Sequence, residues 1–342
     1  MPDQLNLGLI GAGRIGRLHA AHIASRIPNA RCLLVADVDE TAAQRAADEF
    51  RINFAVQDYR MVLDSPAIDA IVICSATHTH AQIIIEAAAA GKHIFCEKPI
   101  DHNLAVIDQA LKAVGQAGVK LQIGFNRRFD ANFARVRDAV ANGEIGEPQL
   151  LHIISRDPTP PPISYIQVSG GIFMDMTIHD FDMARFLMGC DAEEIYAAAG
   201  VMVDPAIGEA GDLDTALLTL KFANGAIGMI DNSRQAVYGY DQRAEVLGSA
   251  GSVRTENNFP NTAIVSTASH VRQDLPLNFF MERYTDSYVN EMQHFVDAVL
   301  EDKPVPVTGE DGRIPVIMAE AARRSYDENR PIRLKELGER GT

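Results

Sequence analysis

The sequence has few cysteines, and their spacing suits neither a metal site nor a disulfide framework. Four thiols, Cys32, Cys74, Cys96 and Cys190, are spread over 342 residues, and no two of them form a Cys-x-x-Cys pair. This spacing excludes a zinc ribbon. It indicates free thiols in a reducing compartment.

Basic residues are also scarce, and long apolar runs are missing. The chain has 31 Lys and Arg against 46 Asp and Glu, which gives a formal net charge of −15. Because nucleic-acid binding needs basic surface that neutralises phosphates, this balance argues against a nucleic-acid partner. No stretch reaches the roughly 18 apolar residues of a membrane span, and the N-terminal residues do not resemble a secretory signal. We therefore expect a cytoplasmic protein with no membrane partner.

What is present is the composition of an ordinary globular protein, with 47% hydrophobic and 23% charged residues. At this length we expect two domains, and no internal repeat is visible. Short apolar runs alternate with helical segments over residues 5–124, which predicts a doubly wound parallel sheet of the Rossmann type. The predicted strands are 5–10, 32–38, 70–73, 93–96 and 121–124, and the predicted helices are 14–26, 41–50, 79–90 and 104–115.

The pattern changes after residue 124. Strand-like segments separated by turn signals predict an α+β domain over 125–330, built on one large, mostly antiparallel open sheet. These predicted strands are 150–155, 195–202, 214–222, 226–232, 243–248 and 252–255, and helices are predicted at 130–142, 284–300 and 312–326. The helix at about 312–326 is a candidate to pack back on the N-terminal domain, and residues 331–342 are expected to form a tail.

The most informative segment joins the first predicted strand to three glycines, Gly11, Gly13 and Gly16. In a dinucleotide-binding turn the first glycine permits the tight turn, the second lets the backbone approach a pyrophosphate, and the third lets the following helix pack on the strand. Asp37 ends the next strand, about 20 residues further on, where an acidic residue accepts hydrogen bonds from a ribose 2′-hydroxyl and repels a 2′-phosphate. The sequence therefore predicts an NAD site in preference to an NADP site.

A second candidate site follows the strand at 93–96. Glu97 and Lys98 lie at the edge of the parallel sheet where ligands of such folds bind, so we expect both side chains to point toward the cofactor cleft. A lysine there can hold a substrate hydroxyl and exchange its proton. The alternative is a surface Glu-Lys pair before Pro99.

Residues 170–187 are predicted to form one helix with a polar stripe. At about 100° per residue, Asp175, His179 and Asp182 fall within roughly 60° of one another. His179 can act as a proton acceptor oriented by a carboxylate, or all three side chains can ligate a metal. The third possibility is a stripe that only faces water, but apolar residues on the rest of the circumference favour a buried helix.

The chain resembles the Gfo/Idh/MocA oxidoreductases over nearly its whole length, and within that family it most resembles the myo-inositol 2-dehydrogenases. The resemblance is carried by five segments: GAGRIG at 11–16, THTH at 77–80, AGKHIFCEKP at 90–99, GFNRRFD at 124–130 and GGIFMDMTIHDFD at 170–182.

The resemblance implies roles for residues that the spacing alone does not assign. It implies a catalytic group of Lys98, Asp175 and His179, a cis Lys98-Pro99 bond, no metal, and a tetramer formed through the open face of the second sheet. It implies that the substrate-binding site is lined by Arg128, Asp157, Asp182 and Tyr238. It implies that the cofactor is bound by Gly11, Gly13, Arg14, Ile15, Gly16, Asp37, Ser75, Thr77, His80, Glu97 and Lys98.

The predicted activity is NAD-dependent oxidation of a ring secondary alcohol, with myo-inositol going to the 2-keto inositol and His179 taking the hydroxyl proton. Another cyclitol or aldose, such as scyllo-inositol or a hexose, is the alternative within the same class. Two further hypotheses are a catalytically silent NAD-binding regulator and a metal-dependent lyase or hydrolase that uses the Asp-His-Asp stripe.

Overall fold

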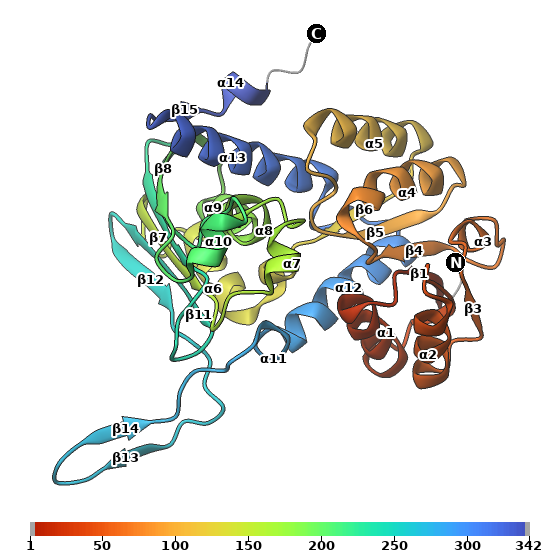
Figure 1. The fold of residues 1–342 in the computed structure, drawn as a ribbon, viewed down its shortest axis with the longest axis horizontal. Helices are drawn as coiled ribbons and strands as arrows, with labels where there is room; N and C mark the ends of the chain where they lie inside the picture. Colours follow the sequence, from red (N-terminus) through yellow and green to blue (C-terminus); the bar gives the residue numbers. More distant parts are fainter. Residues whose placement is uncertain (1–3, 339–342) are drawn as a thin grey trace. The chain divides into compact units, whose positions relative to one another are not determined.

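The structure is a computed structural model that describes residues 4–338. The chain divides into two compact units (Figure 1). One holds the described residues up to Phe129 together with Asp286–Ile314, and the other holds Asp130–Thr285 and the described residues from Pro315 onward. Residues 286–314 thus return to the N-terminal unit, whereas the sequence-based division kept them with the C-terminal domain.

The N-terminal unit is built on a six-stranded parallel sheet with the order β3-β2-β1-β4-β5-β6. This is the doubly wound order, in which the chain direction across the sheet reverses between β1 and β4. The strands are β1 (Leu5–Ile10), β2 (Ala30–Ala36), β3 (Phe54–Val56), β4 (Ala70–Ile73), β5 (His93–Glu97) and β6 (Leu121–Gly124). The helices are α1 (Arg14–Arg26), α2 (Glu40–Phe50), α3 (Arg60–Leu63), α4 (Thr77–Ala89), α5 (Leu104–Ala117), the 3-10 helix η1 (Asn126–Phe129) and α12 (Thr285–Leu300).

Local sequence sets where these helices begin and end. The Asn103 side chain accepts a hydrogen bond from the Ala105 backbone N–H at the start of α5, and Gly118 ends the helix in the left-handed conformation. Both are favoured residues at these positions, because a short polar side chain satisfies a free N–H and glycine tolerates a positive φ.

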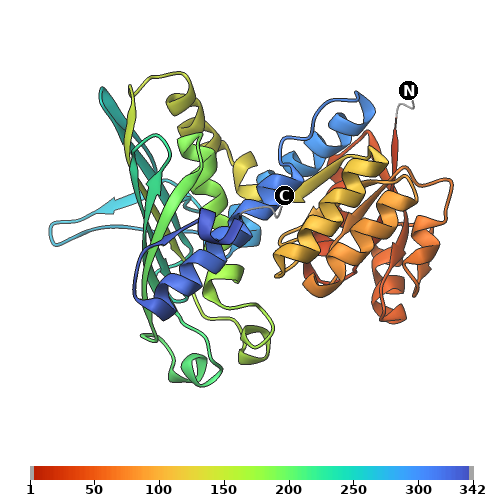
Figure 2. The same ribbon diagram turned by 90° about the horizontal axis from the view of Figure 1, so that it is seen from above.

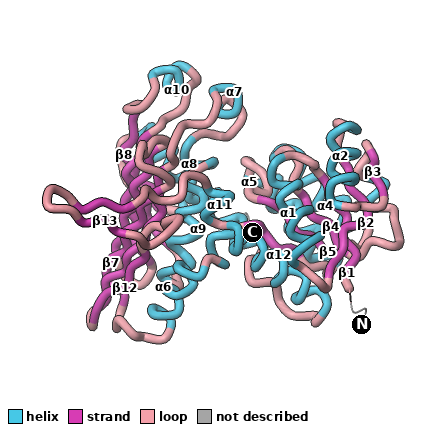
Figure 3. Tube along the Cα trace, turned by 90° about the horizontal axis from the view of Figure 1, so that it is seen from below, coloured by secondary structure: helices cyan, strands magenta, loops and turns pink. Residues whose placement is uncertain are grey.

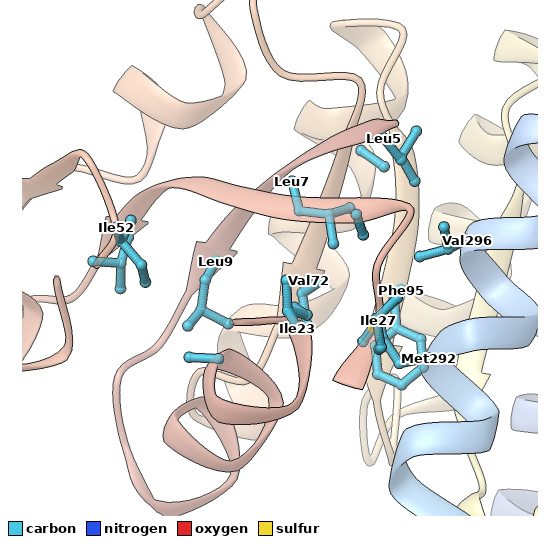
Figure 4. Close-up of a cluster of buried hydrophobic side chains, with 14 of the residues drawn as sticks. Leu5, Leu7, Leu9, Ile23, Ile27, Ile52, Val72, Phe95, Met292 and Val296 are labelled. Carbon is cyan, nitrogen blue, oxygen red and sulfur yellow. The ribbon is translucent and has the colours of Figure 1, made fainter. Parts of the chain in front are cut away.

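The core of the N-terminal unit combines β1 with a helix from late in the chain (Figure 4). Leu7 and Leu9 of β1 are completely buried in this cluster. On α12, Met292 and Phe295 are also completely buried, and the Phe295 ring meets the Phe95 ring of β5 edge-on, with centroids 5.8 Å apart. Burial of each such side chain contributes about 2 kcal/mol, so α12 is an integral part of this core.

The C-terminal unit is built on a seven-stranded sheet with the order β12-β11-β7-β10-β9-β8-β15. All neighbouring pairs are antiparallel except β7 and β10. The strands are β7 (Pro148–Arg156), β8 (Ala192–Gly200), β9 (Thr215–Phe222), β10 (Ile227–Ser233), β11 (Asp241–Gly248), β12 (Gly251–Thr255) and β15 (Ile332–Arg333). β15 lies in the segment that was expected to be a tail.

Helices cover one face of this sheet and leave the other face open (Figures 2 and 3). Along β9, Ala216 and Leu218 are buried, whereas Leu217 between them is exposed, as expected for a strand with one covered face. A hairpin of β13 (Ile264–Ser266) and β14 (Val271–Gln273) projects on the open side. The helices are α6 (Ala131–Ala141), α7 (Ile163–Ile166), α8 (Ile172–Asp175), α9 (Thr177–Met188), α10 (Pro205–Glu209), α11 (Phe280–Arg283), α13 (Gly309–Glu328) and α14 (Lys335–Gly338).

None of the helices within residues 4–338 is both long enough and apolar enough to cross a membrane. All four cysteines are free.

Candidate active site

The predicted cofactor residues gather at the carboxyl edge of the parallel sheet. Gly11 follows β1, Asp37 follows β2, Ser75 follows β4, and Lys98 follows β5. Backbone hydrogen bonds tie these ends together, since the Gly11 N–H donates to the Ala36 carbonyl at 2.8 Å. In sheets of this order the ligand crevice lies at the carboxyl ends of the strands, on either side of the point where the order reverses.

The three glycines of the motif meet different surroundings. Gly11 has a φ of +99°, and a Cβ there would lie 2.6 Å from the Cys74 and Ser75 backbone. A Cβ on Gly16 would lie 1.9 Å from the Gly11 carbonyl oxygen. A Cβ on Gly13 would have no heavy atom within 4 Å. Gly11 and Gly16 are therefore required by the turn itself, whereas Gly13 faces open space at the start of α1.

Asp37 joins two of these loops. Its carboxylate accepts hydrogen bonds from the Ala12 backbone N–H at 2.6 Å and from the Asp39 backbone N–H at 2.9 Å. A carboxylate offers about four acceptor positions, so these two bonds leave capacity for a diol.

His80 fixes the loops that follow β4 and β5. Its Nδ1 lies 2.8 Å from the Pro99 carbonyl oxygen and its Nε2 lies 2.9 Å from the Ser75 carbonyl oxygen. Both ring nitrogens are thus engaged with the backbone, and the side chain is 2% exposed. The Lys98-Pro99 peptide bond between these loops is cis. Thr77, also predicted to bind the cofactor, is the first residue of α4.

Glu97 and Lys98 have different surroundings, although both were expected to point toward the cleft. The Glu97 carboxylate lies 2.8 Å from His19 Nε2, which is completely buried on α1. Only 13% of the Glu97 side chain is exposed, so it is engaged inside the unit. The physical reason is the contact with buried His19, which draws the side chain of Glu97, the last residue of β5, into the unit; its half-buried neighbour Lys98 lies beyond the strand.

Arg128, predicted to bind substrate, belongs to this same unit. It lies on η1 and donates through Nη2 to the Asp311 carboxylate at 3.0 Å. Burial alone would raise the pKa of Asp311, but the Arg128 cation and the bonds from Thr308 lower that pKa below its usual value.

In the C-terminal unit, Asp175 is part of a buried ionic network. Arg234 donates to Asp175 at 3.1 Å and to Asp212 at 3.1 Å, and only 1% of the Arg234 side chain is exposed. Tyr165 donates its hydroxyl to Asp175 at 2.8 Å. Although burial disfavours a cation, the charges of Asp175, Asp212 and then Asp157 raise the pKa of Arg234 above its usual value. The network therefore holds Asp175 in one orientation beside a permanent positive charge.

The predicted single helix over 170–187 is wrong, because the structure has two helices. α8 ends at Asp175, Met176 forms a turn, and α9 begins at Thr177. The Thr177 hydroxyl donates to the Asn232 side chain at 2.6 Å, and Asn232 donates to Asp180 at 2.8 Å. These bonds hold the start of α9 against β10, and because the regular helix is interrupted at Met176, the angular argument does not extend across it.

The remaining predicted residues of this unit lie in different places. His179 is half-buried on α9, and Asp182 on the same helix is 1% exposed. The Tyr238 hydroxyl donates to Asp241 at 2.5 Å and accepts from Arg156 at 3.0 Å. The cross-strand pair Ser155 and Gln242 is buried under the helices. Arg156 and Asp241 form the next pair along the two strands, so their side chains point to the open face. Tyr238 is thus not brought together with Asp175.

Two family models match consecutive parts of the chain. Residues 5–125 match the oxidoreductase family with an NAD-binding Rossmann fold, and residues 133–254 match the GFO/IDH/MocA C-terminal domain. The chain belongs to the Gfo/Idh/MocA family of oxidoreductases.

Individual relatives of this Gfo/Idh/MocA protein match it from end to end. Uncharacterized oxidoreductase YrbE of Bacillus subtilis is 50% identical over 98% of each chain. Myo-inositol 2-dehydrogenase of Thermotoga maritima is 46% identical, over 97% of this chain and 99% of that protein. The crystal structure of scyllo-inositol dehydrogenase from Lactobacillus casei with bound NAD(H) and scyllo-inositol has a TM-score of 0.91 at 28% identity, over 97% of this chain and 99% of that one.

The residues at the carboxyl edge fit the NAD that the family binds. Gly13 leaves the start of α1 open, and the N–H groups at a helix N-terminus attract phosphate. Asp37 is placed to accept from a ribose diol and would repel a 2′-phosphate. Residues suited to both halves of an NAD site, the pyrophosphate and the adenosine ribose, therefore lie at this edge of the sheet.

Several residues of the Gfo/Idh/MocA site were missed by the sequence reasoning. Arg234, Asp212 and Asp180 are buried polar groups that anchor Asp175 and the start of α9. Arg234 follows the predicted strand at 226–232, and an isolated charge in a turn is an uninformative signal by itself. Only the tertiary fold brings it to Asp175, 59 residues earlier.

Proposed function

We propose that this protein is an NAD-dependent dehydrogenase of a cyclic polyol, with myo-inositol oxidised to the 2-keto inositol as its reaction. The observation that carries the proposal is the 46% identity to myo-inositol 2-dehydrogenase of Thermotoga maritima over nearly the full length of both chains. The NAD-binding geometry supports it, and so does the anchored Asp175, because oxidation of an alcohol needs a hydride acceptor and a base.

In the proposed mechanism Lys98, Asp175 and His179 act on the reacting hydroxyl. His179 takes the hydroxyl proton, since an imidazole is an effective base near neutral pH. Asp175, held by Arg234 and Tyr165, orients that imidazole or accepts from a neighbouring hydroxyl. Lys98 binds the reacting oxygen and stabilises the negative charge that develops on it. NAD, when bound, accepts the hydride at its nicotinamide C4.

The substrate pocket is proposed to include Arg128, Asp157 and Asp182. A substrate-binding role for Tyr238 remains a prediction from the sequence resemblance alone. Charged and amide side chains that bind hydroxyl groups discriminate strongly between stereoisomers, because a misplaced hydroxyl leaves a buried polar group unpaired. Scyllo-inositol is the second candidate substrate, favoured by the similarity to the Lactobacillus casei enzyme that binds it.

The direct test is a substrate panel with the purified protein. We expect reduction of NAD with myo-inositol, at a kcat/KM at least about tenfold above that for scyllo-inositol and D-glucose, and weaker activity with NADP because Asp37 repels a 2′-phosphate. Absorbance of the reduced nicotinamide follows the reaction.

Other outcomes of the panel would contradict the proposal in distinct ways. Tight NAD binding with no turnover of any polyol would indicate a catalytically silent regulator. Activity that EDTA abolishes and a divalent metal restores would indicate metal-dependent chemistry. Faster turnover of scyllo-inositol or an aldose would keep the reaction class and change the substrate.

We also propose that the protein is a homotetramer that associates through the open face of the C-terminal sheet. Leu150, Ile227 and Leu247 lie side by side on β7, β10 and β11 and are 47%, 51% and 39% exposed. A contiguous apolar row on a solvent-facing sheet is typical of an association surface. Sedimentation equilibrium should give four times the chain mass for the native protein, and Ile227→Glu should reduce it. A native mass equal to one chain would contradict the proposal.

The cytoplasm is the proposed location. All four cysteines are free, as is usual where glutathione and thioredoxin keep thiols reduced. Recovery of the protein in a periplasmic or membrane fraction after cell fractionation would contradict this.

A further inference from the structure

Three ionisable side chains come together behind the loop that carries Lys98. They are His19 on α1, Glu97 at the end of β5 and Glu291 on α12, and their nitrogen and oxygen donor atoms all lie within 4.8 Å of one another. His19 and Glu291 are completely buried. Among residues 4–338 this is the only group of three possible metal ligands found at such spacing.

The surrounding residues hold the Glu97 carboxylate in this cluster and leave space for it. One of its carboxylate oxygens lies 2.8 Å from His19 Nε2. Gly124, its cross-strand partner on β6, leaves the room that the carboxylate occupies, because a Cβ there would lie 3.0 Å from Glu97 Cδ. The His19 ring is itself fixed by edge-on contacts with Phe95 and Tyr288.

Glu291 has different surroundings from Glu97. Neither of its carboxyl oxygens has a hydrogen-bond partner within the described part of the chain. The Gln122 side chain donates to the Glu291 backbone carbonyl at 2.8 Å, which fixes α12 against β6 at this point. Burial and then the charge of Glu97 raise the pKa of Glu291 well above its ordinary value. A neutral carboxyl group has an O–H donor, and a carboxylate oxygen of Glu97 lies within 4.8 Å of a Glu291 carboxyl oxygen.

The cluster is linked to Lys98 through the backbone. Glu97 is the last residue of β5 and Lys98 is the next residue, so a fixed Glu97 side chain restrains the backbone from which Lys98 projects. On the other side of Lys98, His80 Nδ1 lies 2.8 Å from the Pro99 carbonyl oxygen and restrains the backbone there.

We propose that Glu291 is a positioning residue that acts through Glu97 on Lys98, in a cluster that accepts one negative charge but not two. The proposal rests on the role of Lys98 given under Proposed function. In the proposed cluster, the carboxyl group of Glu291 is neutral and donates its proton in a hydrogen bond to the Glu97 carboxylate. Glu97 is then the single anion, and His19 also stabilises it. Ionisation of Glu291 would place a second anion beside Glu97 and would loosen the strand end that carries Lys98.

The other titratable groups that face Glu291 do not compensate such a charge. Cys74, directly after β4, is near enough to feel the charges of both Glu97 and Glu291, and Cys96 on β5 feels that of Glu97. Burial raises the pKa of both thiols well above its usual value, so they stay neutral. Tyr288 lies one turn earlier on α12 with its ring against His19. His19 is therefore the one group of the cluster that can carry a positive charge.

The test compares Glu291→Gln, which imitates the neutral acid, with Glu291→Leu, which fills the space without a donor. Near pH 7 we expect Glu291→Gln to keep kcat within about threefold of the unchanged protein. Glu291→Leu should lower kcat by at least about tenfold with little change in the KM for NAD, because Glu97 loses its donor. Glu320→Gln on the exposed side of α13 is the matched control and should change nothing.

The pH dependence separates a protonated acid from a merely structural side chain. A carboxyl whose pKa is raised on folding stabilises the protein fully below its unfolded pKa, and this stability is lost as the pH rises through the folded pKa. The Tm of Glu291→Gln relative to the unchanged protein should therefore increase as the pH rises above the ordinary glutamate pKa of about 4.3, and its kcat should lack the alkaline decline of the unchanged protein.

A readout without turnover keeps this test independent of the substrate assignment. With lysines dimethylated with ¹³C, the Lys98 methyl signal should move in Glu291→Leu and stay in place in Glu291→Gln. If no polyol is oxidised, the proposed function fails, whereas the Lys98 signal and the Tm difference still decide this inference. Equal losses of kcat in Glu291→Gln and Glu291→Leu would overturn this inference. Loss of activity in EDTA with recovery on adding Zn²⁺ would also overturn it, because the cluster would then be a metal site.

Discussion

Lys98→Met is expected to lower kcat for myo-inositol by about a thousandfold while leaving the Kd for NAD nearly unchanged. A positioned side chain that transfers or stabilises a proton contributes about 10²- to 10⁴-fold to the rate. Methionine keeps the length of lysine and removes its charge and donors, so the loop between β5 and Pro99 should keep its fold. Stopped-flow turnover and NAD titration by fluorescence measure the two quantities.

The matched control is Lys112→Met on the exposed side of α5, which should leave both quantities unchanged. A parallel loss is expected for His179→Gln, because the hydroxyl proton then has no acceptor. If Lys98→Met and His179→Gln each kept more than about a tenth of the activity, the catalytic assignment would be wrong.

Substitutions in the glycine motif are expected to give the second large effect. One glycine should affect mainly the free energy of unfolding, and another mainly the affinity for NAD. Gly16→Ala should lower the free energy of unfolding by about 3 kcal/mol, because its Cβ would lie 1.9 Å from the Gly11 carbonyl oxygen. Gly13→Ala should leave that free energy within about 1 kcal/mol, since its Cβ meets open space and its φ is −71°. It should nevertheless weaken NAD binding at least about tenfold, because the pyrophosphate must approach this backbone closely.

Denaturant unfolding without NAD, followed by NAD titration, checks both changes. Gly115→Ala is the control, because its Cβ also meets open space but lies within α5. It should stabilise the protein by about 0.5 to 1 kcal/mol and leave NAD binding unchanged. An unchanged affinity for NAD in Gly13→Ala would contradict the prediction that the pyrophosphate binds at this turn.

The N-terminal sheet could be predicted closely because its signals are local. The predicted bounds of Leu5–Ile10, Ala70–Ile73 and Leu121–Gly124 agree with the structure to the residue, because each is a short, mostly apolar segment. β3 (Phe54–Val56) was missed, since three residues at the sheet edge carry too little pattern.

The polar part of the site depends on contacts that are distant in sequence. The helix break at Met176 lies beside the bond between Thr177 and Asn232, which are 55 residues apart, and no glycine or proline stands at the break to indicate it. The inward position of Glu97 likewise needs His19, 78 residues away. Residue types therefore indicated which chemistry is present, whereas the orientation of each group is set by the tertiary fold.

The position of α12 has a consequence for how the protein is made. Translation proceeds from the N-terminus, yet Met292, Phe295 and Val296 complete the core under β1 and β5. The nucleotide-binding unit therefore stays unfinished on the ribosome until the chain has been extended at least to Leu300, after every strand of the C-terminal sheet except β15 has been synthesised. In a nascent chain that ends before this helix, the apolar side chains of β1 and β5 that α12 covers would stay exposed.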